Sequence, residues 1–211
     1  MVLPKLYDAK QYVLAQAPFD KTTASDFYRL VTQCKPELII LLMDLDSSNE
    51  AQYIISLESE VTKYGIFSIK YKKNEKIIQS KENVEKYSHY TITITWGEKN
   101  EEKYDLITFN TWVEDKVIPT QDFVKFHKSV HKLLSDKPRE CSQLVVCPTG
   151  VHRAGIWTVF DMEAERLKTK NRIRFSDTIR NVRNQRCNVI EHFELFDGLL
   201  NLLVAYAKMQ M

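Results

Sequence analysis

The chain has 211 residues, and its 30 basic and 28 acidic side chains leave a net charge of only +2. This balance gives no basic footprint for nucleic acid, and no run of about 18 apolar residues is present to span a membrane. The first residues, Met1–Lys5, lack the apolar core of a signal peptide. We therefore expect one domain over residues 1–211, without a nucleic-acid or membrane partner.

The four cysteines of the chain are irregularly spaced and fit neither a zinc site nor a disulfide framework. Reduced thiols are typical of cytoplasmic proteins, so we expect an intracellular, reducing location. The sequence also shows no glycine-rich dinucleotide loop and no metal-ligand cluster. We expect neither a cofactor nor a metal.

The N-terminal third predicts a strand, a helix and a second strand. Gln11–Ala15 is a short strand candidate, and residues 22–25 contain threonines and a serine that are suited to cap a helix ending at Cys34. Glu37–Met43 is apolar on both faces, which is typical of a strand in the centre of a sheet covered on both sides.

The middle of the chain, from about residue 53 to 108, predicts short strands. Tyr90–Trp96 alternates polar and apolar residues as a half-exposed antiparallel strand does. The charged run Gly97–Lys103 is interpreted as the turn to the next strand. The other strand candidates are residues 67–71, 77–78 and 106–109.

The last third predicts helices around one more strand. Residues 121–134, the segment after Gly155, residues 175–185 and residues 191–208 show helical periodicity, and a short apolar run leads into Cys147. Helices at both ends around strands indicate an α/β domain with a central mixed, twisted sheet flanked by helices. The last helix carries apolar residues that form either its core face or a partner surface: Leu199, Leu200, Leu202, Leu203, Val204 and Tyr206.

The chemistry is concentrated where the strand ending at Cys147 meets the following helix. Unpaired amides and the positive end of a helix dipole converge at such a junction and favour an anion. The same field favours the Cys147 thiolate, and the Arg153 guanidinium is a planar fork for two phosphate oxygens. The expected phosphate-binding residues are Pro148, Thr149, Gly150, Val151, His152, Arg153 and Ala154.

This Cys-x5-Arg pattern resembles the signature loop of the classical protein tyrosine phosphatases, His-Cys-x-x-Gly-x-Gly-Arg-Ser/Thr-Gly. Cys147, Gly150, Arg153 and Gly155 match it. Further segments resemble the family in the family's order, namely residues 12–18, 26–28, 51–53, 109–112 and 183–186. The resemblance covers roughly residues 12 to 206 and implies the phosphatase fold.

The resemblance also implies a general acid on the loop after Trp112, where the family has Trp-Pro-Asp-x-Gly-Val-Pro. Here that loop is one residue longer and lacks the first proline and the glycine. Counting from Trp112 places Glu114 at the acid position, whereas counting back from Pro119 places Asp115 there. Each carboxyl is a candidate acid, and both are equally compatible with a role on the loop surface.

Other departures affect different steps of the reaction that the family performs. Val146 replaces a loop-orienting histidine, and Ala154 replaces a hydroxyl residue that helps the thiolate leave. Glu191 stands where a glutamine positions the second-step water, in a region that also contains Gln185, and a carboxylate there repels phosphate. His152 replaces a glycine and is either a surface imidazole or a further contact to phosphate. The family's N-terminal segment that packs on the phosphotyrosine ring is not found, and Tyr7 is a weak substitute for it.

Three functions remain open from the sequence. One is a pseudophosphatase, an interaction module that binds a phosphorylated, phosphotyrosine-containing protein through the loop with impaired or absent catalysis. The second is an active phosphatase with a Cys147 cysteinyl-phosphate intermediate. The third is a scaffold for another signalling protein, with a vestigial loop. We favour the first, because losses at separate steps compound.

Overall fold

The computed structural model describes residues 11–43, 51–55, 60–74, 87–112, 117–135 and 142–209. Its centre is a mixed sheet with the strand order β1-β7-β2-β6-β5-β4-β3. The contacts β1–β7, β7–β2 and β2–β6 are parallel, whereas β6, β5, β4 and β3 pair antiparallel. The strands are β1 (Gln11–Gln16), β2 (Leu38–Leu41), β3 (Thr62–Tyr64), β4 (Phe67–Lys73), β5 (Tyr87–Trp96), β6 (Asn100–Phe109) and β7 (Ser142–Cys147).

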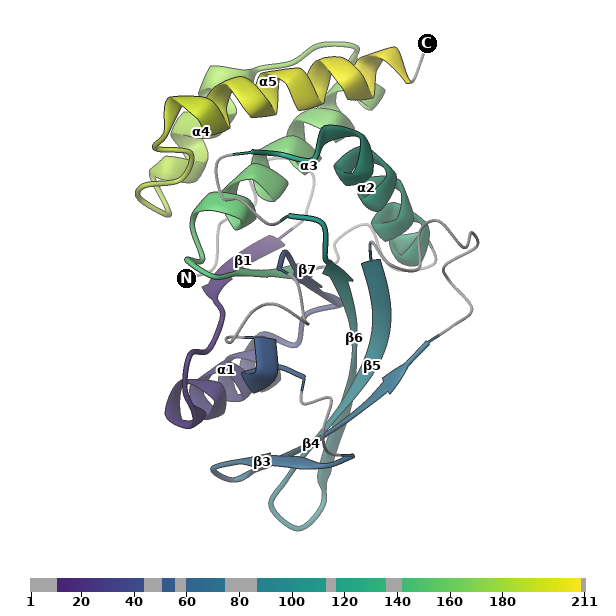
Figure 1. Cartoon of the computed structure of the whole chain (residues 1–211), viewed down its shortest axis with the longest axis vertical. Helices are drawn as coiled ribbons and strands as arrows, with labels where there is room; N and C mark the ends of the chain where they lie inside the picture. Colours follow the sequence, from purple (N-terminus) through teal and green to yellow (C-terminus); the bar gives the residue numbers. More distant parts are fainter. Residues whose placement is uncertain are drawn as a thin grey trace.

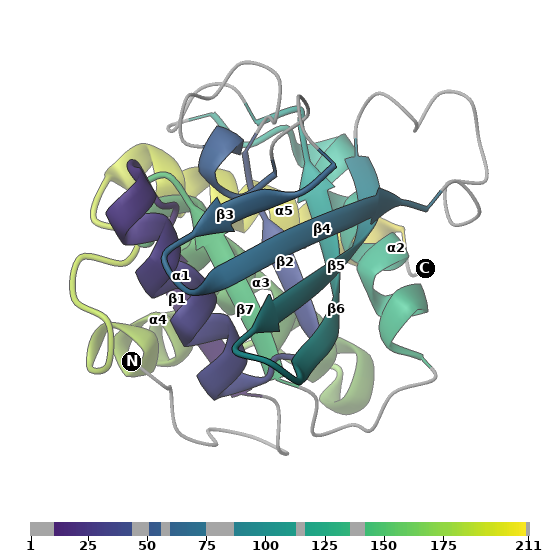
Figure 2. The same cartoon turned by 90° about the horizontal axis from the view of Figure 1, so that it is seen from below.

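Helices cover both faces of this sheet unequally. α1 lies on one face, and α2, α3, α4 and α5 lie together on the other (Figure 1). Figure 2 shows α1 and the edge strands β3 and β4 of the sheet toward the viewer, with α3 and α5 behind the sheet. The helices are α1 (Lys21–Cys34), α2 (Thr120–Leu134), α3 (His152–Lys170), α4 (Phe175–Arg183) and α5 (Phe193–Lys208), with a short 3₁₀ turn at Ala51–Tyr53.

The parallel strands are buried on both sides, as predicted for the apolar strand at β2. Alternate residues of one strand enter different cores because strand side chains alternate between faces. Leu38 and Ile40 pack with the four-helix side, whereas Ile39 and Leu41 pack with α1. The predicted α/β fold with a mixed sheet is therefore confirmed.

Several element boundaries differ from the predictions. α1 begins at Lys21 because Asp20, rather than residues 22–25, is its cap: the Thr23 amide donates to Asp20 at 2.7 Å and lowers the pKa of that carboxyl. β6 begins at Asn100, so the turn predicted over 97–103 is shorter. The strand candidate at residues 77–78 lies outside the described residues.

The last helix is mainly a core element rather than an open apolar face. Leu199, Leu202, Leu203 and Tyr206 are buried, whereas Val204 is exposed. α5 packs mainly against α2 and α3, and its Phe196 ring contacts Phe175 of α4. Among the described residues, none of the helices combines the length and the apolar character needed to cross a membrane.

Candidate active site

Cys147 is the last residue of β7, an interior strand of the sheet, and it is fully buried. Its carbonyl accepts hydrogen bonds from the amides of Ala17, at 2.9 Å, and Gly150, at 3.2 Å. The bond from Ala17 ties the cysteine loop, residues 147–155, to the chain just after β1, and the bond from Gly150 closes a turn within the loop. Of the cysteines in the described part of the chain, Cys34, Cys147 and Cys187 are free thiols.

Gly150 allows the cysteine loop to lie against β1. Its φ of +66° is in the left-handed region, which a residue with a side chain rarely adopts. A Cβ at this position would lie 2.5 Å from the Gln16 amide nitrogen, a backbone atom that cannot rotate away. A glycine is therefore required both for the turn and for the close approach.

Thr149 places its hydroxyl inside the cysteine loop. Thr149 Oγ1 accepts hydrogen bonds from the amides of Val151, at 3.3 Å, and His152, at 3.2 Å. The same oxygen lies 3.8 Å from Cys147 Sγ. Since these amides are the donors expected to bind an anion, the hydroxyl takes the acceptor position that a phosphoryl oxygen needs.

Arg153 lies in the first turn of α3 and is buried, with 6% of its surface exposed. Its Nη1 donates to the Leu42 carbonyl at 3.1 Å, and its guanidinium carbon lies 5.6 Å from the centre of the Trp112 ring. The carbonyl and the aromatic face together fix the plane of the guanidinium beside the loop. The predicted accessory residue Trp112 is thus a neighbour of Arg153.

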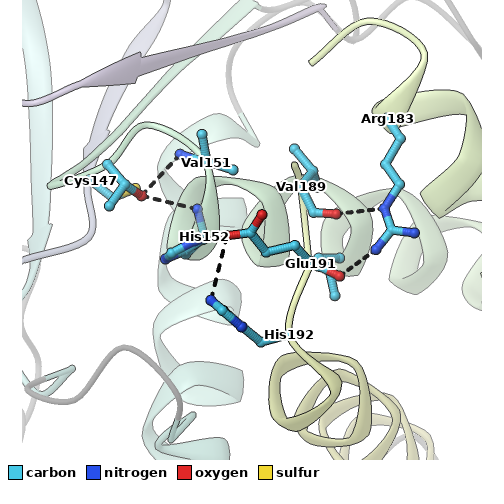
Figure 3. A network of polar contacts seen from close by, with 9 residues as sticks. Cys147, Val151, His152, Arg183, Val189, Glu191 and His192 are labelled. Carbon is cyan, nitrogen blue, oxygen red and sulfur yellow. Dashed lines mark hydrogen bonds and ion pairs between the residues drawn. The ribbon is translucent and has the colours of Figure 1, made fainter. Parts of the chain in front are cut away.

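Glu191 lies between two imidazoles at the side of the loop (Figure 3). Glu191 Oε1 is 3.3 Å from His152 Nε2 and 3.5 Å from His192 Nε2. His152 is in the first turn of α3 and has no left-handed backbone, so the glycine of the family pattern is not needed here. The side chain of His152 therefore contacts Glu191 rather than standing alone at the loop surface.

The turn that carries Glu191 is held by two arginines. Arg183 donates to the carbonyls of Val189, at 2.8 Å, and Ile190, and Figure 3 shows its side chain directed at Val189. Arg186 donates to the Gly150 carbonyl at 3.3 Å. Ile190 has a φ of +56°, a strained value for a β-branched residue, which the bonds from Arg183 stabilise.

Gly155 lets this turn approach α3. A Cβ at Gly155 would lie 2.5 Å from Cγ1 of Val189. The match of Gly155 to the phosphatase pattern thus has a packing reason, because any larger residue would push Val189 and the following Glu191 away from the cysteine loop.

Comparison with known proteins agrees with this geometry. A family model described as protein-tyrosine phosphatase matches residues 2–205. The chain belongs to the protein-tyrosine phosphatase family.

Individual relatives are distant from this phosphatase domain. It is similar to tyrosine-protein phosphatase 69D of Drosophila melanogaster, with 23% identity over 93% of this chain and 14% of that protein. It is also similar to the mouse non-receptor type 5 enzyme, with 22% identity over 95% of this chain and 36% of the relative. The human non-receptor type 7 enzyme is likewise 22% identical, over 95% of this chain and 54% of its own length. This chain therefore spans about half or less of these curated relatives.

The departures from the family pattern lie at defined places in this phosphatase domain. Val146 is fully buried in the core on the α1 face, where its side chain offers no hydrogen bond. Ala154 is fully buried in the other core. Gln185 follows α4, and its buried Oε1 has no hydrogen-bond partner within the part of the chain that the structure describes.

The structure brings together some predicted site residues and leaves two undescribed. Cys147 and the phosphate-binding residues Pro148 to Ala154 form one loop, with Glu191 bonded to its His152. The candidate acids Glu114 and Asp115 lie outside the described residues, as does Tyr7. Sequence reasoning missed the Leu42 carbonyl and His192, because backbone acceptors carry no sequence signal and His192 was passed over beside Glu191.

Proposed function

We propose that this domain binds phosphorylated protein, with phosphotyrosine as the recognised group, through its cysteine loop and with impaired or absent catalysis. The observation that carries the proposal is the position of the Thr149 hydroxyl, which accepts from two loop amides and lies 3.8 Å from Cys147 Sγ. A phosphoryl group must displace this hydroxyl before the sulfur can reach phosphorus.

The retained binding elements support recognition of a phosphoryl group. The first turn of α3 supplies amides and the positive end of a long helix, from His152 to Lys170. Arg153 adds a fixed guanidinium, whose charge-assisted bonds to phosphate are about twice as strong as neutral ones. These elements require no proton transfer, so they serve binding without turnover.

The altered positions argue against fast turnover. The side chains of Val146 and Ala154 carry no hydrogen-bond donor for the loop or the sulfur. The Glu191 carboxylate stands where the family pattern has a neutral amide, which positions the second-step water. Its contacts to His152 and His192 keep a carboxylate at the edge of the anion site. Each change affects a different step, so their costs in rate multiply.

An active phosphatase is the second candidate, and one observation favours it. The Thr149 hydroxyl is close enough to Cys147 Sγ to supply the hydroxyl that Ala154 lacks. In this case the Cys147 thiolate attacks phosphorus, the bond to the leaving oxygen breaks, and Glu114 or Asp115 protonates that oxygen. Water then attacks phosphorus, and the sulfur leaves as thiolate.

The test measures turnover and binding on the same protein preparation. Hydrolysis of an aryl phosphate and of a phosphotyrosine peptide is followed beside Cys147→Ser, and affinity for the phosphopeptide is measured beside the unphosphorylated peptide. We expect binding that needs the phosphate and is lost in Arg153→Met, with little or no turnover. Turnover that vanishes in Cys147→Ser establishes the active enzyme instead. If the protein shows neither turnover nor phosphopeptide binding, the scaffold function is the one that remains.

We expect this function to take place inside the cell, with a phosphoprotein or another signalling protein as the partner. A thiol whose role is to contact phosphate must stay reduced, which is compatible with the free state of Cys147. The residues proposed to meet the phosphoprotein are those of the cysteine loop together with Glu191 and His192, which line its edge.

A further inference from the structure

A second polar cluster lies between α2 and α3, about 13 Å along α3 from the cysteine loop by the rise of an α-helix. His127 and His131 are one turn apart on α2 and face the same side. Both Nε2 atoms point at one oxygen of Asp161, with distances to Oδ1 of 2.8 Å and 2.5 Å. We call these three residues the His–Asp cluster.

The other oxygen of Asp161 is held from the opposite side. Asp161 is fully buried, and its Oδ2 accepts from the Tyr12 hydroxyl at 2.6 Å and from the Gln143 side-chain amide at 3.4 Å. The Gln143 oxygen in turn accepts from the Trp157 ring nitrogen at 2.9 Å. Such outer partners orient a ligand, so Oδ1 is presented to the two imidazoles.

A hollow of about 180 Å³ adjoins the cluster and is lined by His127, His131, Glu165 and Tyr206, together with two lysines. Glu165 lies one turn after Asp161 on the same face of α3. Burial and then the charges of Asp161 and Glu165 raise the pKa of the Tyr206 hydroxyl, which places both carboxyls near it. α2 therefore contributes two candidate ligands spaced by one turn, and α3 contributes Asp161.

We propose that His127 Nε2, His131 Nε2 and Asp161 Oδ1 form a binding site for a divalent transition-metal ion, with zinc as the best fit. Nitrogen and carboxylate ligands in a set of three or four suit zinc, and two histidines four residues apart on one helix chelate it from one face. The candidate ligand atoms of the three residues lie within 4.8 Å of one another. Glu165 lines the adjoining hollow and adds a negative charge there, outside this set of three.

The geometry requires a small adjustment to admit the ion. Zinc bonds of about 2.0–2.1 Å in a tetrahedron separate the ligand atoms by about 3.3 Å, whereas the imidazole nitrogens are 2.8 Å and 2.5 Å from Asp161 Oδ1. The His131 side chain is 31% exposed beside the hollow, so it has room to move. His127 and Asp161 are buried and keep their places.

Protons compete with the ion at this site. Each imidazole binds the ion only through a deprotonated Nε2, whereas in the ion-free structure both Nε2 atoms lie at hydrogen-bond distance from Asp161 Oδ1. The charged groups around the hollow are Glu165, which favours a cation, and Lys128 and Lys168, which oppose it. A bound ion would join α2 to α3 and, through Asp161 and Tyr12, to β1, a purely structural role that is independent of phosphate binding.

The test is a titration of the metal-free whole chain with Zn²⁺ by calorimetry, and with Co²⁺ by absorption, which reports both coordination and any sulfur ligand. We expect one equivalent, no sulfur charge-transfer band, and at least about tenfold weaker binding in His131→Gln. His131 is partly exposed, so this variant is expected to fold, which far-UV circular dichroism checks. Tyr12→Phe removes the hydrogen bond from the Tyr12 hydroxyl to Asp161 Oδ2, and it is expected to weaken zinc binding about tenfold.

His192→Gln is the matched control, because His152, Glu191 and His192 also lie within ligand distance of one another. It should leave the affinity unchanged if the His–Asp cluster is the site. The proposal is overturned if no saturable binding occurs, if His131→Gln binds as well as the unchanged protein, or if the loss follows His192→Gln or a thiol instead.

Discussion

The first turn of α3 faces the proposed anion site, which is made of backbone amides. Further along, the same helix carries Asp161, a buried carboxylate held by side chains. In the cysteine loop the amides of Val151 and His152 are satisfied by one threonine hydroxyl, at 3.3 and 3.2 Å. At Asp161 the carboxylate accepts from Tyr12, His127, His131 and Gln143. The first set of partners is local in sequence, and the second comes from three other elements.

Because of this difference, the hydroxyl in the cysteine loop can be replaced by a ligand, whereas the partners of Asp161 are fixed. A neutral hydroxyl is a weaker acceptor than a phosphate oxygen, so a ligand can replace Thr149 at modest cost. A buried carboxylate cannot lose its donors without leaving a charge unpaired, which costs several kcal/mol. The proposed phosphate binding is therefore assigned to the start of α3, whereas we expect the packing of α2, α3 and β1 to depend on Asp161.

The largest expected effect comes from removing the buried carboxylate. In metal-free protein, Asp161→Ala should lower the free energy of unfolding by about 3–5 kcal/mol, because it orphans buried donors on three elements. Urea denaturation measures this. The control is Asp177→Ala, which breaks an exposed pair with Arg180 at 3.4 Å and should cost less than about 0.5 kcal/mol. Equal costs would show that the buried network does not hold these elements together.

Next in size is the cost of a side chain at the turn of the cysteine loop. Gly150→Ala combines a left-handed backbone with a contact of 2.5 Å to the Gln16 nitrogen. We expect about 2–3 kcal/mol of destabilisation and weaker phosphate binding. Gly97→Ala has a similar φ of +62°, but its Cβ would lie 3.5 Å from Asn100 Nδ2, so it should cost about 1 kcal/mol. If Gly97→Ala also weakens phosphate binding, the effect is not one of loop docking.

A smaller effect is expected from the hydroxyl in the anion position. Thr149→Val keeps the shape but removes the competing acceptor, so phosphate affinity should rise by roughly fivefold, equivalent to about 1 kcal/mol. Thr149→Ser keeps the hydroxyl and should bind as the unchanged protein does. Calorimetry with inorganic phosphate measures both. If Thr149→Val instead lowers turnover of an aryl phosphate while binding is unchanged, the hydroxyl assists the sulfur and the active enzyme is the better description.

The smallest effect concerns alkaline pH. Burial and the charges of Asp161 and Glu165 raise the pKa of the Tyr206 hydroxyl above 10.0. The folded state thus holds this proton more tightly than the unfolded chain, so the contribution is present below pH 10 and is lost as the pH rises through the folded pKa. Urea denaturation from pH 8 upward should show a shallower loss in Tyr206→Phe. Parallel curves would contradict the placement of both carboxyls near Tyr206.

Local sequence patterns predicted much of the fold and the backbone elements that carry the candidate site. The strand–loop–helix junction at Cys147 could be predicted because its residues are contiguous, and β2 because apolar residues on both faces indicate a central strand. The cap at Asp20 had a local signal as well, Asp-x-x-Thr, that was passed over. The predictions failed where the partner is a backbone atom or is far along the chain.

The sequence by itself determined the family-like loop, the order of strands and helices and the substitutions at Val146, Ala154 and Glu191, because each depends on neighbouring residues. Only the tertiary structure decided that Arg153 bonds to the Leu42 carbonyl and that Asp161 meets Tyr12, 149 residues away. Such contacts form when separate elements pack, and the identities of the residues do not specify which side chains then meet. Whether the cysteine loop only binds a phosphorylated group or also hydrolyses it depends on contacts of this kind.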